Sequence, residues 1–326
     1  MAQTQSELVL TTPRMRYPMT AALFDGRVSI PGVRLEKADV TPVIYDDVPD
    51  LREGNFGLAD LNIGYLLPAL EAGWQITAIP VFTIRGSHYQ NIWVRTDRGI
   101  ESPADLAGKT IATRTFRTAG TIWVRGHLQH QFSVDPYSIR WASQMNEAFP
   151  VYDERVQRDP GDSKRKHPLD SLLDGDVDAA IAAIIPPRDR DAWETDRRVK
   201  HLFPDYIAQG ERLHAETGIV TPSRVIVMSR KTDREHPDLA RKLFDAFEEA
   251  KSLAYKELYS DGTPGPVLFF HEFVMAQKAR YGDPFGYGVA ANRATIDEFI
   301  HYNLEQGLIR KPLSYEDVFA SATLDT

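Results

Sequence analysis

LDSLLDGDVDAAIAAII, residues 169–185, is the stretch that decides the fold. It predicts a helix that ends at Gly175, followed by a buried strand that starts at Asp178. The stretch IESPADLAGKTIAT, residues 100–113, repeats this order with a short helix, a stop at Gly108 and an apolar strand. Glycine readily adopts the left-handed conformation that closes a helix, and an apolar run suits a strand covered on both faces. Two such units predict an α/β fold with helices packed against a sheet.

The length, net charge and composition of the chain exclude several classes of protein. The chain has 326 residues, which is enough for two α/β lobes. Its formal net charge of −8 disfavours a long basic track, so we expect no nucleic-acid partner. The first residues lack the apolar core of a secretory signal, and no segment reaches the roughly 20 apolar residues of a membrane span. We therefore expect no membrane partner and a cytoplasmic location. Cysteine is absent, which excludes disulfides, thiolate metal ligands and cysteine nucleophiles.

Short motifs follow one another in a fixed order along nearly the whole chain. They are Tyr17 and Thr20 before Phe24–Val28, Ala78–Phe82 with Arg85, Asp105–Leu106 with Gly108–Lys109, Trp123 with Arg125–Gly126, Trp141, Leu202–Asp205, Thr217–Ile219, Asp283–Pro284 with Tyr287–Gly288, Asn292–Arg293 and Gln306–Leu308. In this order they resemble the 4,5-dihydroxyphthalate decarboxylase family, an enzyme branch of the periplasmic-binding-protein-like type II fold. The resemblance implies two lobes, each a mixed sheet flanked by helices, with a ligand cleft between them.

The same resemblance divides the chain. It implies a discontinuous lobe one at residues 1–97 and 225–326 and a lobe two at residues 98–224. The β-rich runs near residues 82–97 and 219–230 are then the two crossings between the lobes. A strongly amphipathic helix directly after the second run returns the chain to lobe one.

The chain departs from the family where a ligand should bind. Family members carry Asp-His after the early tyrosine, whereas Pro18 and Met19 stand here. An Arg-His-Ser run is replaced by His88–Gln90, a Glu-Tyr-Gln triplet by Thr115–Arg117, and a histidine of the return crossing by Arg224. We therefore expect a retained scaffold with a changed ligand, and the sequence leaves open whether the reaction is retained.

The resemblance implies a cofactor-independent decarboxylase acting on a small anionic aromatic substrate, a hydroxylated aromatic or heteroaromatic carboxylic acid. Such a reaction needs groups that orient the carboxylates, a proton donor for the ring carbon and an apolar environment for the departing carbon dioxide. A guanidinium matches a carboxylate in shape and charge, so arginines near the predicted cleft are candidate ligands. They are Arg85, Arg114, Arg117 and Arg224, of which we favour Arg117. His88 is the candidate catalytic acid or base, because histidine titrates near neutral pH.

The other candidate substrate-binding residues are aromatic, hydroxyl and amide side chains. They are Tyr17, Asn62, Tyr65, Tyr89, Thr115, Phe116, Thr118 and Asn146. The aromatic members would enclose a ring, whereas Thr115 and Thr118 would meet an anion at the start of a helix. The competing interpretation places the aromatic side chains in the core and the arginines in ion pairs, and the sequence leaves both open.

We expect no cofactor and no metal. His127 and His130 are three residues apart on a predicted helix, but no acidic ligand accompanies them in a matched motif. The main alternative function is a non-catalytic binding protein for a small anionic solute in transport or sensing. A single-turnover enzyme like the pyrimidine-synthesising branch of this superfamily is disfavoured, because that branch carries a cysteine-bearing motif. The sequence leaves open whether the chain forms a homo-oligomer.

Overall fold

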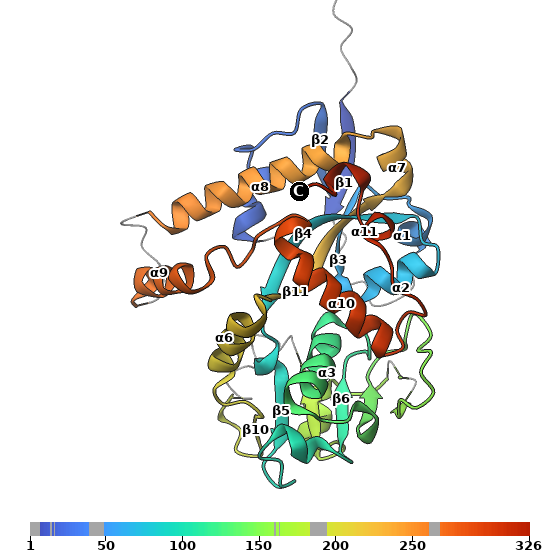
Figure 1. The fold of residues 1–326 in the computed structure, drawn as a ribbon, viewed down its shortest axis with the longest axis vertical. Helices are drawn as coiled ribbons and strands as arrows, with labels where there is room; N and C mark the ends of the chain where they lie inside the picture. The colour runs from blue at the N-terminus through green and yellow to red at the C-terminus, as the bar shows by residue number, and fades with distance from the viewer. Residues whose placement is uncertain are drawn as a thin grey trace, which may run out of the picture.

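The computed structural model describes residues 7–13, 15, 17–38, 49–159, 161–162, 164–182, 194–260 and 268–326. Within these residues the chain forms a six-stranded, a three-stranded and a two-stranded sheet with helices packed around them. Figure 1 shows the six-stranded sheet at the lower end of the molecule and the other two sheets in its upper half. The predicted α/β architecture is confirmed.

The six-stranded sheet has the order β10, β5, β9, β6, β7 and β8. Its strands are β5 (Ile92–Arg95), β6 (Thr110–Thr113), β7 (Arg140–Ser143), β8 (Arg158–Asp159), β9 (Ala179–Ile181) and β10 (Val199–His201). β6 lies parallel to β7 and β9, whereas β5 is antiparallel to β9 and β10. The carboxyl ends of β6 and β9 therefore meet at the same edge of the sheet.

Helices cover both faces of this sheet. Successive residues of β6 belong to opposite core clusters, one shared with α3 (Ala119–Phe132) and the other with α4 (Pro168–Asp174). The helix that precedes β9 ends at Gly175 with φ 82°, and the 3-10 turn that precedes β6 is followed by Gly108 with φ 76°. Glycine adopts these left-handed values without steric cost. The parts of both stretches that the structure describes, residues 100–113 and 169–182, thus fold as the sequence predicts, whereas residues 183–185 lie outside the described residues.

The three-stranded sheet has the order β3, β11 and β4, and its neighbours are antiparallel. Its strands are β3 (Leu58–Asn62), β4 (Ile76–Gly86) and β11 (Thr221–Ser229). The two-stranded sheet pairs β1 (Leu8–Pro13) with β2 (Val33–Ala38) in parallel. Beyond β4 the chain enters the six-stranded sheet through β5, so the first β-rich run forms two strands in different sheets. The exact lobe limits at residues 97/98 and 224/225 stay a prediction.

Further helices surround the sheets. They are α1 (Pro49–Glu53), α2 (Leu66–Glu71), α6 (Tyr206–Thr217), α7 (Arg230–Glu235), α8 (Leu239–Leu258), α9 (Phe270–Tyr281), α10 (Arg293–Glu305) and α11 (Tyr315–Val318). α8 is the amphipathic helix that the sequence predicts after the second β-rich run. Its buried stripe, which includes Leu243 and Phe247, packs in one cluster with Ile79 of β4.

Helix α10 packs on α3. The ring centroids of Trp123 and Phe299 lie 5.3 Å apart. Gly126 lies so close to Tyr302 that a Cβ atom at this glycine would come within 2.0 Å of the ring. The contact therefore requires glycine at position 126. The contact with α10 therefore supports α3.

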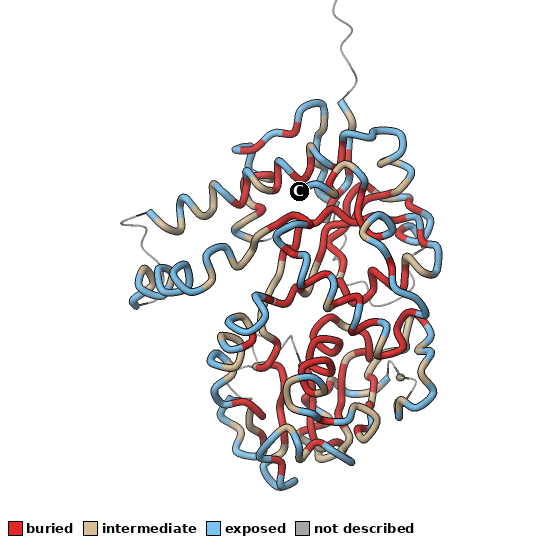
Figure 2. Tube along the Cα trace, viewed as in Figure 1, coloured by how far each residue is buried: buried red, intermediate tan, exposed pale blue. Residues whose placement is uncertain are grey.

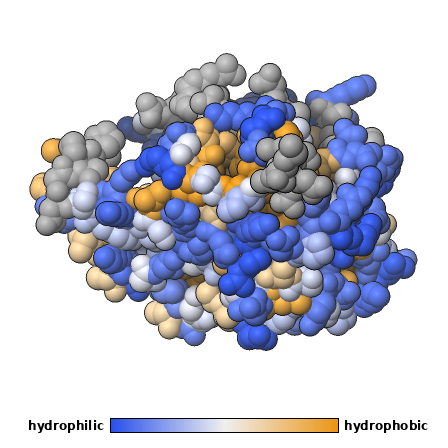
Figure 3. Space-filling model, turned by 90° about the horizontal axis from the view of Figure 1, so that it is seen from above, coloured by the Kyte–Doolittle hydropathy of each residue, from blue (hydrophilic) through white to orange (hydrophobic). Residues whose placement is uncertain are grey.

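Buried residues lie in the interior (Figure 2) and polar residues dominate the face shown in Figure 3. Buried residues gather in the interior of both halves of the molecule, whereas α9 has no buried residue (Figure 2). Figure 3 shows a mostly hydrophilic face with a central group of hydrophobic side chains. Across the described residues, we find no helix with the length and apolar character needed to cross a bilayer.

Candidate functional site

A cavity of about 250 Å³ lies where strands β4 and β11 of the three-stranded sheet meet the six-stranded sheet. Its described walls come from the ends of β3, β4, β6 and β9, from β11 and from the first residues of α3 and α4. In open α/β sheets, ligands bind beyond the carboxyl ends of the strands. Six of the predicted site residues line this cavity: Asn62, Arg85, His88, Arg114, Thr118 and Arg224.

The charge of the lining is positive. Arg85, Arg114 and Arg224 contribute guanidinium groups, and His88 and His167 contribute imidazoles. None of the described residues that line the cavity is acidic. The first turn of the 14-residue helix α3 adds the positive end of a helix dipole. Although the chain carries a net charge of −8, this cavity favours a small anion.

His88 lies in the left-handed backbone region with φ 65° and is buried. Positive φ is uncommon outside glycine and concentrates at functional sites. The amide Nδ2 of Asn91 lies 3.1 Å from His88 Nδ1 and donates to it, which places the proton of the neutral ring on Nε2. His88 Nε2 lies 3.4 Å from Ser223 Oγ. Burial lowers the pKa of His88 to about 4, so the ring is neutral at pH 7.

Arg224 is oriented by a buried carboxylate. Its Nη1 donates to the backbone oxygen of Asp60 at 2.7 Å and lies 3.4 Å from Asp60 Oδ2. Asp60 also accepts hydrogen bonds of 2.7 Å from Tyr17 and Thr83. Burial raises the pKa of Asp60, and Arg224 and the two hydroxyl groups oppose that shift. Tyr17 therefore lies behind Arg224 and not in the cavity lining.

The guanidinium of Arg85 forms several hydrogen bonds with the protein itself. It donates to the backbone oxygens of Val220 and Gly286 at 2.9 Å each, and to the side chain of Asn292. Burial lowers its pKa to about 10, so the group stays charged at neutral pH. Arg85 thus ties β4 to the loops around it while contributing positive charge to the cavity.

Asn62 fixes the start of α3. Its Oδ1 accepts hydrogen bonds of 3.0 Å from the backbone N–H groups of Gly64 and Ala119. Thr118, the residue before α3, shares a hydrogen bond of 2.7 Å with Thr121. Asn62 and Thr118 lie in the lining, and their observed bonds position the helix end that faces the ligand space.

Arg117 does not line the cavity, although we favoured it from the sequence. Its side chain is 0% exposed, its Nε lies 3.1 Å from Glu147 Oε2, and its Nη2 donates to the backbone oxygen of Phe149 at 2.5 Å. The Glu147 carboxylate also accepts from the backbone N–H of Phe116. These contacts give Arg117 a structural role.

Five further candidates lie outside the lining. The hydroxyl groups of Tyr65 and Thr115 bond each other at 2.8 Å in the interior. Phe116 is buried under a guanidinium and packs edge-on against a tryptophan. Tyr89 is buried among other rings, and Asn146 is exposed. The interpretation that aromatic side chains form core is therefore the one that their positions favour.

Several lining residues are not predicted by sequence reasoning. Asn91, Gly120, His167 and Ser223 all border the cavity. A Cβ atom at Gly120 would lie 3.3 Å from His88 Nδ1, so glycine lets α3 approach the imidazole. His167 accepts a hydrogen bond from the N–H of the second residue of α4, at 3.3 Å. The His-Pro pair directly before an apolar helical run is the sequence signal that could have identified this helix start.

Two solved binding proteins share the fold of this chain. The periplasmic aliphatic sulphonate binding protein SsuA from Escherichia coli is 14% identical, covers 98% of this chain and 99% of its own, and has a TM-score of 0.54. SsuA from Xanthomonas axonopodis, solved with bound MOPS, is 14% identical over 97% of this chain and 96% of its own, with a TM-score of 0.50. The fold is therefore the two-lobe periplasmic-binding-protein-like fold, as the sequence predicts.

Curated relatives are enzymes by name. 4,5-dihydroxyphthalate decarboxylase from Comamonas testosteroni is 27% identical over 338 aligned positions, which cover 98% of this chain and 99% of that protein. The enzyme of the same name from Pseudomonas putida is 27% identical over 183 positions, which cover 52% of this chain and 68% of that protein. No family model matches the chain. The chain is thus similar along its whole length to a decarboxylase.

Proposed function

We propose that this protein is a carboxy-lyase that releases carbon dioxide from a hydroxylated aromatic or heteroaromatic carboxylic acid without a cofactor. The cavity lining carries the proposal, because three arginines and two histidines surround it and no described lining residue is acidic. The full-length similarity to 4,5-dihydroxyphthalate decarboxylase supports the reaction class. The cytoplasmic location expected from the sequence stays a prediction.

Arg224 and Arg114 hold the substrate carboxylates in the proposed reaction. Arg224 is suited to this because Asp60 and its backbone oxygen fix one edge of the guanidinium. Arg114, which follows β6 directly, is a second guanidinium in the lining. Two separate guanidinium groups give each carboxylate of a flat diacid its own partner.

His88 is the proton donor in the proposed reaction. The imidazole is neutral in the free protein, and a carboxylate bound beside it favours the charged form and so raises its pKa. The imidazolium then protonates the ring carbon that bears the leaving carboxylate. The carbon–carbon bond breaks, its electron pair returns to the ring, carbon dioxide leaves, and His88 regains a proton from water.

A carbon dioxide release assay tests the function. The purified protein, treated with a chelator, is incubated with a panel of hydroxylated aromatic acids that begins with 4,5-dihydroxyphthalate. We expect turnover of at least one acid, and His88→Gln should reduce kcat more than it weakens binding. The matched control His236→Gln replaces an exposed histidine elsewhere on the surface and should behave as wild type. Binding without any turnover across the panel would refute the lyase proposal.

A binding protein for a small anionic solute is the second candidate. It is favoured by the low pKa of His88, which leaves the free cavity without a ready proton donor at neutral pH. The sulfonate-binding proteins of the same fold make aliphatic sulfonates the first solutes to test. Thermal shift with sulfonates and aromatic acids, followed by recovery of the unchanged ligand, distinguishes this candidate from the enzyme.

A further inference from the structure

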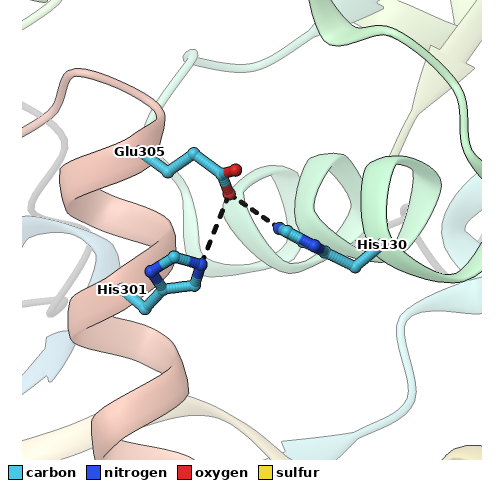
Figure 4. Close-up of side chains that lie close together, drawn as sticks. All are labelled: His130, His301 and Glu305. Atoms are coloured by element: carbon cyan, nitrogen blue, oxygen red, sulfur yellow. Dashed lines mark hydrogen bonds and ion pairs between the residues drawn. The ribbon is translucent and has the colours of Figure 1, made fainter.

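Two histidines from different helices converge on one carboxylate oxygen outside the cavity (Figure 4). His130 Nε2 of α3 lies 2.7 Å from Glu305 Oε2, and His301 Nε2 lies 3.8 Å from the same oxygen. His301 and Glu305 are four residues apart on α10 and share a face of that helix. His127, which we paired with His130 from the sequence, is instead buried among aromatic rings.

We propose that His130, His301 and Glu305 bind a divalent transition metal, with zinc as the best fit. Two imidazoles and one carboxylate are a common protein ligand set for zinc, and a water completes the tetrahedron. Ligand atoms about 2.1 Å from a tetrahedral zinc stand roughly 3.4 Å apart. The observed separations of 2.7 and 3.8 Å lie on either side of that value.

A hydrogen bond alone explains only part of this arrangement. The pair of His130 and Glu305 is an ordinary hydrogen bond at 2.7 Å. His301 Nε2, at 3.8 Å, is beyond hydrogen-bond distance from the oxygen toward which it points. A metal between the three groups satisfies both rings, provided that each carries its proton on Nδ1 and leaves the Nε2 lone pair to the metal.

Neighbouring side chains hold the ligands in place. Gln129 donates a hydrogen bond of 2.6 Å to Glu305 Oε1, the oxygen that the histidines leave unused. The ring of Tyr302 stacks on His130 with centroids 5.3 Å apart and an interplanar angle of 3°. Such outer contacts orient metal ligands and strengthen binding. Side-chain exposures of 37% for His130 and 53% for His301 leave an open path for the ion.

The metal would act as a clamp and not as a catalyst. His130 lies twelve residues beyond Thr118 on α3, a distance of about 18 Å along the helix axis. The ion is therefore remote from the ligand cavity. The first turn of α3 borders that cavity, and the ion joins the other end of α3 to α10. Zinc thus stabilises the α3–α10 contact that supports the cavity wall.

Zinc titration by isothermal calorimetry tests the site. After treatment with a chelator and its removal, the full chain should bind one zinc ion, and zinc should raise Tm by several degrees at saturation. His301→Gln is the cleanest variant, because His301 is half exposed and its change should leave folding intact. We expect His301→Gln and Glu305→Gln each to weaken zinc binding at least about tenfold, and His236→Gln to have no effect.

Two further measurements separate this site from surface binding of zinc. Cobalt should give the intense visible absorption of a tetrahedral site in the wild type and lose it in His301→Gln. Hydrogen exchange in the second half of α3 should slow when zinc is added. Equal zinc affinity in the wild type and His301→Gln, or the absence of saturable one-to-one binding, overturns the proposal. Unchanged exchange in α3 overturns the clamp role.

Discussion

Replacement of Arg224 by glutamine should weaken both stability and ligand binding, for two separable reasons. Asp60 is 1% exposed, so Arg224→Gln leaves a buried carboxylate without its cation. Loss of one partner of a buried ion pair costs about 3–5 kcal/mol. We expect the lower end of this range, because Tyr17 and Thr83 still donate hydrogen bonds to Asp60.

The stability loss should depend on pH. Burial already raises the pKa of Asp60 in the folded state, and removal of Arg224 raises it further. The folded protein then binds more protons than the unfolded chain, so the free energy of unfolding falls as pH rises above about 4. We therefore expect Arg224→Gln to be more destabilised relative to wild type at pH 7 than at pH 4.

The double variant Arg224→Gln with Asp60→Asn separates the two effects. It removes the buried charge together with its partner, so most of the stability should return. Ligand affinity should remain low, since a hydrogen bond to a charged group contributes about 1.5–3 kcal/mol, or roughly 10- to 150-fold in Kd. Asp60→Asn alone is the control that keeps the guanidinium.

Urea unfolding followed by tryptophan fluorescence measures the stability, and calorimetry measures the affinity for the best anionic ligand of the wild type. The reasoning fails if Arg224→Gln is as stable as wild type at pH 7. It also fails if the double variant binds the anion as tightly as wild type, because Arg224 would then not contact the ligand.

Other predictions concern the two buried histidines and Arg117. Burial lowers the pKa of His127 to about 3 and of His88 to about 4, below the usual 6.5, so the free energy of unfolding should fall as pH drops from 6.5 toward 4. His127→Phe keeps a ring in this aromatic site, and in urea unfolding it should reduce the change of the free energy of unfolding with pH. An unchanged pH dependence would mean that His127 does not cause it. Arg117→Met should cost about 3–5 kcal/mol, because Glu147 stays buried without its partner. The folded variant should bind ligand as tightly as wild type. A large loss of affinity would mean that Arg117 contacts the ligand.

Two arginines close together in the sequence show what local patterns cannot predict. Arg114 follows β6 directly and lines the cavity, as a residue at the carboxyl end of a parallel strand should. Arg117 is three residues further and turns into the core, because Glu147 provides a buried partner. No local pattern distinguishes the two, since the deciding carboxylate lies 30 residues away along the chain.

Local patterns in the chain were enough to predict the helix–glycine–strand units, the two β-rich runs and the amphipathic helix α8. Those features depend on side-chain periodicity and on backbone preferences within about one turn or strand. The left-handed backbone of His88, the support of Arg224 by Asp60 and the convergence of His130 with Glu305 required the folded chain. They arise from contacts between residues as much as 175 positions apart, and burial and charge pairing at such separations are set only when the sheets and helices pack together.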